Sequence, residues 1–230
     1  MKHIILIVIF SLPGVAQPPE PQPAREEGLG IVAKLKSNAE ALQHYAYRRR
    51  TSITTKDKSR TRLELVRYVD GKMETVPLDS PDNAARSGGG RGRRRGMLGQ
   101  NGGQKREEMR EQVEQLNTMF RSYTAPEGLQ PMFAKAVVSR EGTPPNIVIR
   151  ASATGVVQPS DSVTWLWSVE HQRPNKIEIQ TELDGKPVSM TVEFAEVANG
   201  PFYPAHVTIV EPKKDITVNI DQYDVAPAGQ

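Results

Sequence analysis

Apolar and polar residues alternate with a period of two over much of the C-terminal third, and this pattern restricts the fold more than any other feature. In Val163-Thr-Trp-Leu-Trp-Ser-Val169 the valines and tryptophans share one side of an extended chain. The same alternation recurs at residues 177–183, 188–194, 207–209 and 216–220. Successive side chains of a strand point to opposite faces of its sheet. The pattern therefore predicts an antiparallel meander with one buried face.

Short turns separate the predicted strands. Asp184-Gly185 and Asn199-Gly200 join strands of the meander, and Asp70-Gly71 has the same character near the N-terminus. Such pairs accept a positive φ and are typical of hairpin turns. Around them, β-branched and aromatic residues predict strands at residues 45–55, 61–68 and 72–78, with a polar turn at 56–60.

Three segments have the spacing of helices instead. Residues 25–43 place Ile31, Leu35, Ala39 and Leu42 on one face. A second helix is predicted from about Gln104, and a shorter one at residues 131–138, where a proline occupies the first turn.

The first residues have the layout of a secretory signal peptide. A basic pair, Lys2-His3, precedes an apolar run at 4–10, and Gly14-Val15-Ala16 supplies small residues before a cut after Ala16. The apolar run is far shorter than the roughly 20 residues of a membrane span. We expect a signal peptide at 1–16, a proline-rich leader at 17–24, one domain at 25–225 and a tail at 226–230. The expected location is the periplasm or the cell exterior.

Residues 84–106 form a basic, glycine-rich segment without any acidic residue. A segment of this composition cannot build a core, so a mobile loop is predicted. Two other interpretations are attraction to anionic lipid headgroups through Arg86, Arg91, Arg93, Arg94 and Arg95, and RNA binding. RNA binding lacks interleaved aromatic residues, and we expect no nucleic-acid partner.

Catalytic and metal-binding patterns are missing from the sequence. It contains no Gly-x-Ser-x-Gly elbow, no His-Glu-x-x-His motif, no phosphate-binding Gly-x-x-x-x-Gly-Lys motif and no cysteine. Beyond the signal segment the histidines are His44, His171 and His206, which are widely separated. They could meet at a metal or be ordinary surface residues, and nothing in their spacing requires a metal. We therefore expect no enzyme activity, no metal and no cofactor.

The order of these elements resembles a known superfamily. A Trp-containing strand leads into Pro174-Asn-Lys-Ile-Glu-Ile179, a Leu183-Asp-Gly-Lys186 hairpin, Gly200-Pro-Phe-Tyr-Pro204 and a final strand. This order is similar to that of the periplasmic lipoprotein carriers, the LolA/LolB-like and RseB-like proteins. The resemblance implies an α+β, mainly β fold: an incomplete antiparallel β-barrel, or curved sheet, with helices covering a concave face that can hold acyl chains. It also implies a gating arginine, for which Arg48, Arg49 and Arg50 are candidates, whereas the basic segment departs from the family pattern.

From this resemblance we expect a monomeric, non-enzymatic carrier of a lipid or lipoprotein acyl chain. The predicted ligand-binding residues are Tyr45, Tyr47, Leu63, Leu65, Trp165, Trp167, Met190, Val192, Phe194, Val207 and Ile209. The predicted lid residues are Met109, Val113, Leu116, Phe120, Met132 and Phe133. The inward aromatic residues could equally fill a core. The alternative function is then an envelope sensor or protein-interaction module with a packed core and no ligand.

The Gly14-Val15-Ala16 boundary makes a direct prediction about processing. Protein recovered from the periplasm of a bacterial host should begin at Gln17, because small residues at these positions direct signal-peptide cleavage. Intact-mass measurement checks this, and a retained Met1 or a cytoplasmic location would contradict it.

Overall fold

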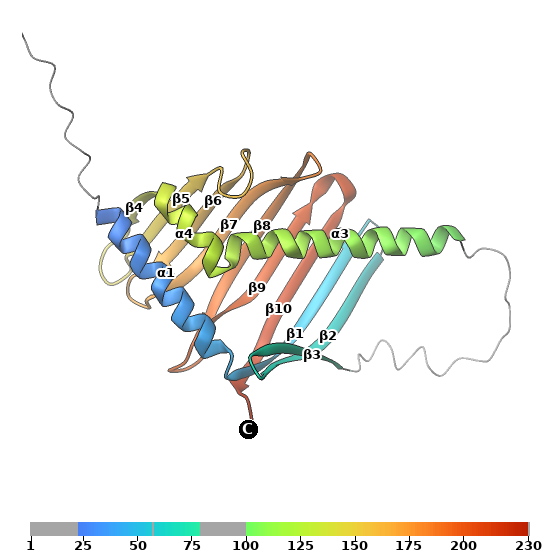
Figure 1. Cartoon of the computed structure of the whole chain (residues 1–230), viewed down its shortest axis with the longest axis horizontal. Coiled ribbons are helices and arrows are strands. Elements are labelled where there is room, and N and C mark those ends of the chain that lie inside the picture. Colours follow the sequence, from blue (N-terminus) through green and yellow to red (C-terminus); the bar gives the residue numbers. More distant parts are fainter. Residues whose placement is uncertain (1–22, 57, 79–99, 230) are drawn as a thin grey trace, which may run out of the picture.

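The structure, a computed structural model, describes residues 23–56, 58–78 and 100–229, and in this part of the chain ten strands form one antiparallel sheet (Figure 1). The order across the sheet is β3-β2-β1-β10-β9-β8-β7-β6-β5-β4. The strands are β1 (Tyr45–Thr55), β2 (Lys58–Val69), β3 (Lys72–Leu78), β4 (Val137–Glu141), β5 (Val148–Thr154), β6 (Ser162–Ser168), β7 (Arg173–Leu183), β8 (Lys186–Glu196), β9 (Phe202–Glu211) and β10 (Ile216–Pro227). Because β3 and β4 are both edges, the sheet does not close.

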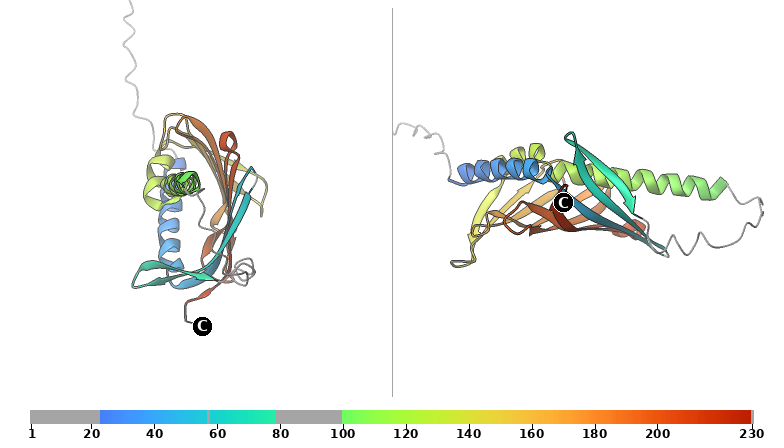
Figure 2. Two further views of the ribbon diagram at one scale, coloured as in Figure 1. Left: turned by 90° about the vertical axis from the view of Figure 1, so that its right-hand side faces the viewer. Right: turned by 90° about the horizontal axis from the view of Figure 1, so that it is seen from below.

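Helices cover one face of this sheet. They are α1 (Pro23–Leu42), α3 (Gln100–Thr124) and α4 (Pro126–Lys135), and a short 3₁₀ turn, η1 (Pro212–Lys214), precedes β10. The sheet curves around the helices, which lie on its concave side (Figure 2). The predicted fold, an incomplete antiparallel barrel with a helix-covered concave face, is confirmed. No helix in the described part of the chain is both long and apolar enough to cross a membrane.

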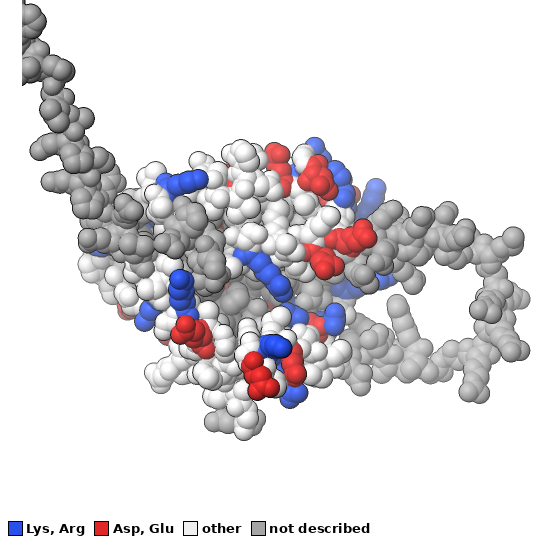
Figure 3. All heavy atoms as spheres, in the orientation of Figure 1, with Lys and Arg blue, Asp and Glu red and all other residues white. Residues whose placement is uncertain are grey.

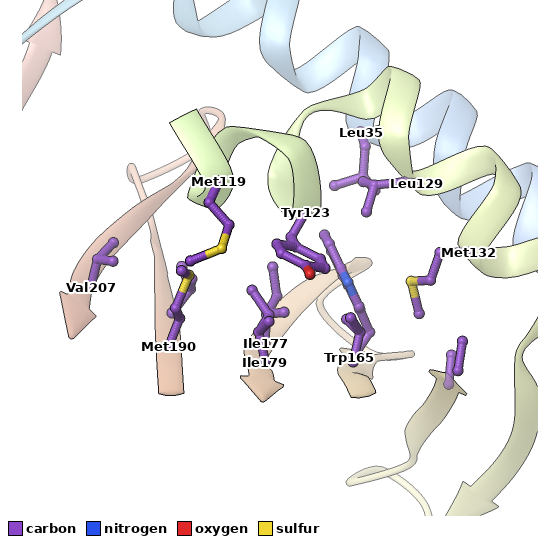
Figure 4. Packing of buried hydrophobic residues seen from close by; sticks show 14 of the residues in the cluster. Leu35, Met119, Tyr123, Leu129, Met132, Trp165, Ile177, Ile179, Met190 and Val207 are labelled. Atoms are coloured by element: carbon purple, nitrogen blue, oxygen red, sulfur yellow. The ribbon is translucent and has the colours of Figure 1, made fainter. Parts of the chain in front are cut away.

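The register brings the predicted apolar positions into rows on the concave face. One row runs through directly paired residues from six strands: Val163, Ile179, Met190, Ile209, Val218 and Ile53. The helices supply the other half of the core. Figure 4 shows Met119 pointing toward Met190, and Leu35 and Leu129 lying close to Trp165. All of these except Ile53 are buried, so the prediction of one buried sheet face is confirmed.

The tight turns have the backbone that their sequences predict. Asp70 and Gly71 have φ values of 50° and 72°, and Asp184 and Gly185 have values of 53° and 68°. Asn199, at the β8–β9 turn, has a φ of 55°. These left-handed conformations suit glycine and short polar residues, which explains why the turns are placed correctly by the sequence.

Several boundaries differ from the sequence prediction. The third helix begins at Pro126 and ends at Lys135, and Val137 starts β4 instead of continuing the helix. Strand β5 was not predicted, because its inward residues Ala151 and Ala153 are too small to produce a strong alternation. Helix α3 begins at Gln100, so residues 100–106 of the predicted mobile loop are helical. Strand β2 begins three residues earlier than predicted, at Lys58.

A buried carboxylate joins the end of α3 to the sheet. Asp161 accepts hydrogen bonds from the backbone N–H groups of Val156, Val157 and Gln158, at 2.7–2.8 Å, and from the Tyr123 hydroxyl at 2.8 Å. Thr181 in turn lies 2.9 Å from that hydroxyl. Burial alone would raise the pKa of Asp161, but these hydrogen bonds outweigh it, so the pKa lies below its ordinary value of 3.8. Burial also raises the pKa of Tyr123 to about 12.

Replacing Asp161 with Asn should lower the free energy of unfolding by about 2–4 kcal/mol at neutral pH, because the charge that accepts these bonds is lost. A carboxylate with a depressed folded-state pKa stabilises the fold above its ordinary pKa of 3.8, and this contribution is lost as the pH falls below that value. Urea unfolding at pH 7 and at pH 3 measures both effects. Asp184→Asn, in an exposed turn, is the control; equal unfolding midpoints for the two variants at pH 7 would contradict the assignment.

Candidate functional site

An apolar hollow of about 180 Å³ lies between α1, α3 and the concave face of the sheet. Its helical wall consists of Leu35, Asn38, Ala39 and Leu42 from α1 and Phe120 and Thr124 from α3. Its sheet wall consists of Trp165, Val192, Phe194, Phe202 and Pro204. The polar groups among these side chains are the amide of Asn38, the hydroxyl of Thr124 and the indole N–H of Trp165. All the other lining side chains are apolar. The surface of the hollow therefore favours a hydrocarbon.

A continuous row of aromatic rings forms the sheet wall and extends beyond it. Phe133 of α4 lies 6.0 Å from Trp165, which lies 6.4 Å from Phe194, measured between ring centroids. Phe202 then contacts both Phe194 at 6.1 Å and Trp167 at 6.2 Å, each with an edge-to-face geometry. Such pairs stabilise a fold by about 0.5–1.5 kcal/mol each beyond the area they bury. The row therefore gives the hollow an aromatic wall.

The side-chain amide of Asn38 fastens α1 to the beginning of β9. Its Nδ2 donates to the carbonyl oxygen of Phe202 at 2.8 Å, and its Oδ1 accepts from the N–H of Phe202 at 2.9 Å. These two bonds satisfy both backbone groups of one residue, as a neighbouring strand would. We call this pair the Asn38–Phe202 clip. It joins a helix to a strand 164 residues away in the sequence.

A second, polar groove of about 530 Å³ lies on the other side of the clip. It is lined by Lys34, Ser37, Asn38, Ala41, His44, Tyr45, His171, Gln172, Glu196, Asn199, Gly200, Pro201 and Phe202. One wall is therefore the last turns of α1, and the other is the β6–β7 and β8–β9 turns. Position 200 is tightly enclosed, because a Cβ there would lie 3.0 Å from the Tyr45 hydroxyl and 3.0 Å from the Val197 side chain.

Eight of the eleven predicted ligand-binding residues lie in three places. Trp165, Val192 and Phe194 line the apolar hollow. Trp167, Met190, Val207 and Ile209 point to the same face but are buried in the packed core. Tyr45 lines the polar groove instead.

Strand β2 presents the opposite face to that expected. Leu63 and Leu65 are half-buried, whereas the buried residues of this strand are Glu64 and Val66. Glu64 is held there by Arg49, whose Nη2 lies 2.7 Å from Oε2, and by Arg62. The structure therefore does not bring Leu63 and Leu65 to the hollow.

Tyr47 lies on β1, paired with Val66 of β2, and is not among the residues that line the hollow. Burial raises the pKa of Tyr47 to about 12, and the neighbouring Tyr68 adds to the rise.

The predicted lid residues belong to α3 and α4. Phe120 lines the hollow, and Phe133 contacts Trp165. Leu116 and Met132 are fully buried beneath the helices, while Val113 is half-buried. Met109 lies within α3, but its side chain is outside the described residues, as are Arg86, Arg91, Arg93, Arg94 and Arg95.

The three adjacent arginines of β1 have separate ion-pair partners. Arg49 pairs with Glu64, Arg50 with Asp221 at 2.9 Å, and Arg48 with Asp224 at 3.4 Å. Neither the hollow nor the groove is lined by any of them. Their role as gating candidates stays a prediction.

The three histidines do not converge. His44 and His171 line the polar groove, but His206 lies on the convex face, with its Nδ1 2.6 Å from Asp221 Oδ1. Burial alone would raise the pKa of Asp221, but hydrogen bonds with His206 and Arg50 outweigh it and lower the pKa. Among the described residues no group of three or more His, Asp or Glu side chains could hold a metal ion.

Some residues of the site were not assigned from the sequence. Leu35 and Leu42 were recognised as one apolar helix face, and Phe202 as part of the Gly200–Pro204 motif, but neither pattern indicates a hollow. Asn38 could not be identified from the sequence, because a hydrogen bond to a residue so far away in the chain produces no recognisable local pattern.

The indole N–H of Trp165 is buried without a hydrogen-bond partner among the described residues.

Replacing Asn38 with Ala should lower the free energy of unfolding by about 1–3 kcal/mol, because two backbone groups of Phe202 lose their partner. Amide hydrogen exchange in the second half of α1 should also become faster, since the clip holds this helix to β9. Ser37→Ala, at an exposed position of the same helix, is the matched control. Unchanged exchange in α1 of the Asn38 variant would show that the clip does not hold the helix.

Comparison with known proteins finds solved structures that are similar to most of this chain at low sequence identity. No protein-family model and no curated protein match this chain. A domain described as an outer membrane lipoprotein-sorting protein, from Vibrio parahaemolyticus, is 13% identical with a TM-score of 0.49, over 89% of this chain and 94% of the other. A DUF1329 family protein from Desulfovibrio piger is 11% identical with a TM-score of 0.48, over 90% and 94%. A LolA superfamily protein from Nitrosomonas europaea is 9% identical with a TM-score of 0.39, over 88% and 94%. All three structures are at most 13% identical to this chain, and each TM-score lies below 0.5.

Proposed function

We propose that this protein is an exported, non-enzymatic binding protein for the acyl chain of a lipid or lipoprotein, which it holds in the apolar hollow. The observation that carries the proposal is the hollow itself: an apolar space walled by aromatic rings between two helices and the sheet. Each methylene transferred there from water contributes about 0.8 kcal/mol. Hydrocarbon is therefore the ligand that this surface binds best.

The size of the hollow requires movement of the helices. Ligand pockets ordinarily measure about 300–1,000 Å³, and the hollow has about 180 Å³. It accommodates only part of a long chain as it stands. A complete acyl chain enters when α1 and α3 move away from the sheet, and the Asn38–Phe202 clip is the polar contact that holds α1 against β9. Closing over the ligand and opening to release it are what a carrier requires.

The location and the membrane contact are parts of the same proposal. Export is supported by the Gly14-Val15-Ala16 boundary, and the periplasm is the proposed site of action. On the face shown in Figure 3, the coloured basic and acidic side chains are intermingled. Because this face shows no separate basic patch, we assign attraction to anionic lipid to the basic segment at 84–106. We further propose that the protein acts as a monomer.

A module with a filled core is the second candidate, and one observation favours it. Trp167, Met190, Val207 and Ile209 point to the concave face but are between 1% and 4% exposed. Most of the space that they would line as a cavity is therefore occupied by α3 and its neighbours. In such a module the sheet edges, not the hollow, would bind a partner.

A fluorescence titration distinguishes the two candidates. Palmitate or a palmitoylated peptide should change the tryptophan fluorescence in a saturable way, because Trp165 lines the hollow. Phe194→Glu should abolish this change, since a carboxylate in an apolar space must lose its hydration or bind a proton. Ser189→Glu, on the opposite face of the same strand, should keep the response.

Circular dichroism of each variant separates lost binding from lost folding. A folded parent protein that responds to no acyl ligand would contradict acyl binding and favour the filled-core module. A Phe194→Glu variant that folds and still binds would show that the chain does not occupy the hollow.

A further inference from the structure

We propose that the polar groove beside the hollow binds an anionic, phosphate-bearing headgroup, so that the ligand is an acidic single-chain amphiphile. This inference rests on the proposed function and specifies the class of molecule that the same site takes. Nothing in the resemblance to carriers assigns a role to the groove.

The two spaces are neighbours with a common partition. Asn38 and Phe202 belong to the walls of both the hollow and the groove. A molecule whose chain lies on the apolar side of the Asn38–Phe202 clip therefore needs to pass only this pair to place its other end on the polar side. The clip uses the amide of Asn38 and the backbone of Phe202, and Gln172 Nε2 uses one N–H on the Val169 carbonyl at 2.7 Å, which leaves its second N–H for a ligand.

The lining of the groove suits a compact polar group. Its volume of about 530 Å³ lies within the range of ligand sites. Hydrogen-bond donors come from both walls: Lys34 and Ser37 from α1, and Gln172 and Asn199 from the two turns. His44 and His171 add two imidazole rings. Donors that converge from opposite sides are what phosphate oxygens require.

The charge balance of the groove favours an anion. Its titratable residues are Lys34, His44, Tyr45, His171 and Glu196. The only carboxylate among these described lining residues, Glu196, is matched by Arg173, whose Nε lies 3.5 Å from Glu196 Oε2. Lys34 makes no ion pair with any residue that the structure describes. One ammonium group therefore lines the groove without a carboxylate partner among the described residues.

Two lipids with the same acyl chain test this inference. Palmitoyl lysophosphatidate and monopalmitoylglycerol differ only in the phosphate, and both are titrated below their critical micelle concentrations with tryptophan fluorescence as the readout. The parent protein should bind the lysophosphatidate about fivefold more tightly, as one partly exposed ion pair allows. Lys34→Gln should remove this preference without changing the affinity for monopalmitoylglycerol. Lys36→Gln, an exposed lysine of α1 outside the groove, should keep it.

The outcomes separate this inference from the proposed function. Equal affinity of the parent for the two lipids, or equal effects of the two lysine variants, would overturn the headgroup assignment while acyl binding stands. No binding of either lipid would overturn both. Millimolar inorganic phosphate should compete only weakly with the lysophosphatidate. If phosphate displaces the lipid when the two are at equal concentrations, the groove is a site for the free ion, and the assignment of an acidic amphiphile as the ligand is overturned.

Discussion

Ten strands in one sheet leave two faces, and in the described part of the chain only three helices are present to cover one of them. The burial of the concave face under these helices is the interaction on which the rest of the molecule depends. The convex face needs no cover, because it carries hydrogen-bonded polar residues such as Ser52 with Thr61 and Thr208 with Asn219. The concave face of the central strands is mostly apolar, with Thr181 and Glu211 as buried polar exceptions, so its stability depends on how closely the helices sit.

Polar contacts fix the helices at a few points. The end of α3 is held through Tyr123 and Asp161, and α1 is held through Asn38 and Phe202. Gln112 of α3 also donates to the buried Glu211 of β9, at 2.7 Å. Elsewhere the helices meet the sheet mainly through apolar side chains, which fit without directional bonds. The hollow lies where the two helices and the aromatic row fail to close completely. A space of this kind can change its volume while the anchoring bonds persist, which is a useful property for a site that must adapt to a chain.

The sequence specifies the sheet more fully than the site. The alternation at residues 163–220 and the Asp-Gly turns predict the meander, since both are local and follow from strand geometry. Strand β2 shows where this reasoning ends. The sequence predicts a strand here, but it does not show which set of alternate residues faces the core. Hydropathy favours Leu63 and Leu65, whereas Glu64 is buried because Arg49 and Arg62 pair with its carboxylate. The Asn38–Phe202 clip cannot be predicted from a local pattern, because its residues are 164 positions apart. The hollow cannot be predicted from residue spacing either, because it depends on how the helices pack on the sheet.

The pairing of β1 with β10 has a consequence for how the molecule is made. In the order of the sheet, β10 is the only described strand that joins β1, β2 and β3 to the rest. Arg50 and Asp221, which meet across this junction, are 171 residues apart in the sequence. Pairing over such a distance is slow, because the intervening chain must lose its freedom first. Until then β1 has an unpaired edge that can join to the wrong partner. A chain delivered N-terminus first across a membrane would complete its sheet only after nearly all of it had arrived, so that assembly follows transport and an escort for the early hairpins becomes valuable.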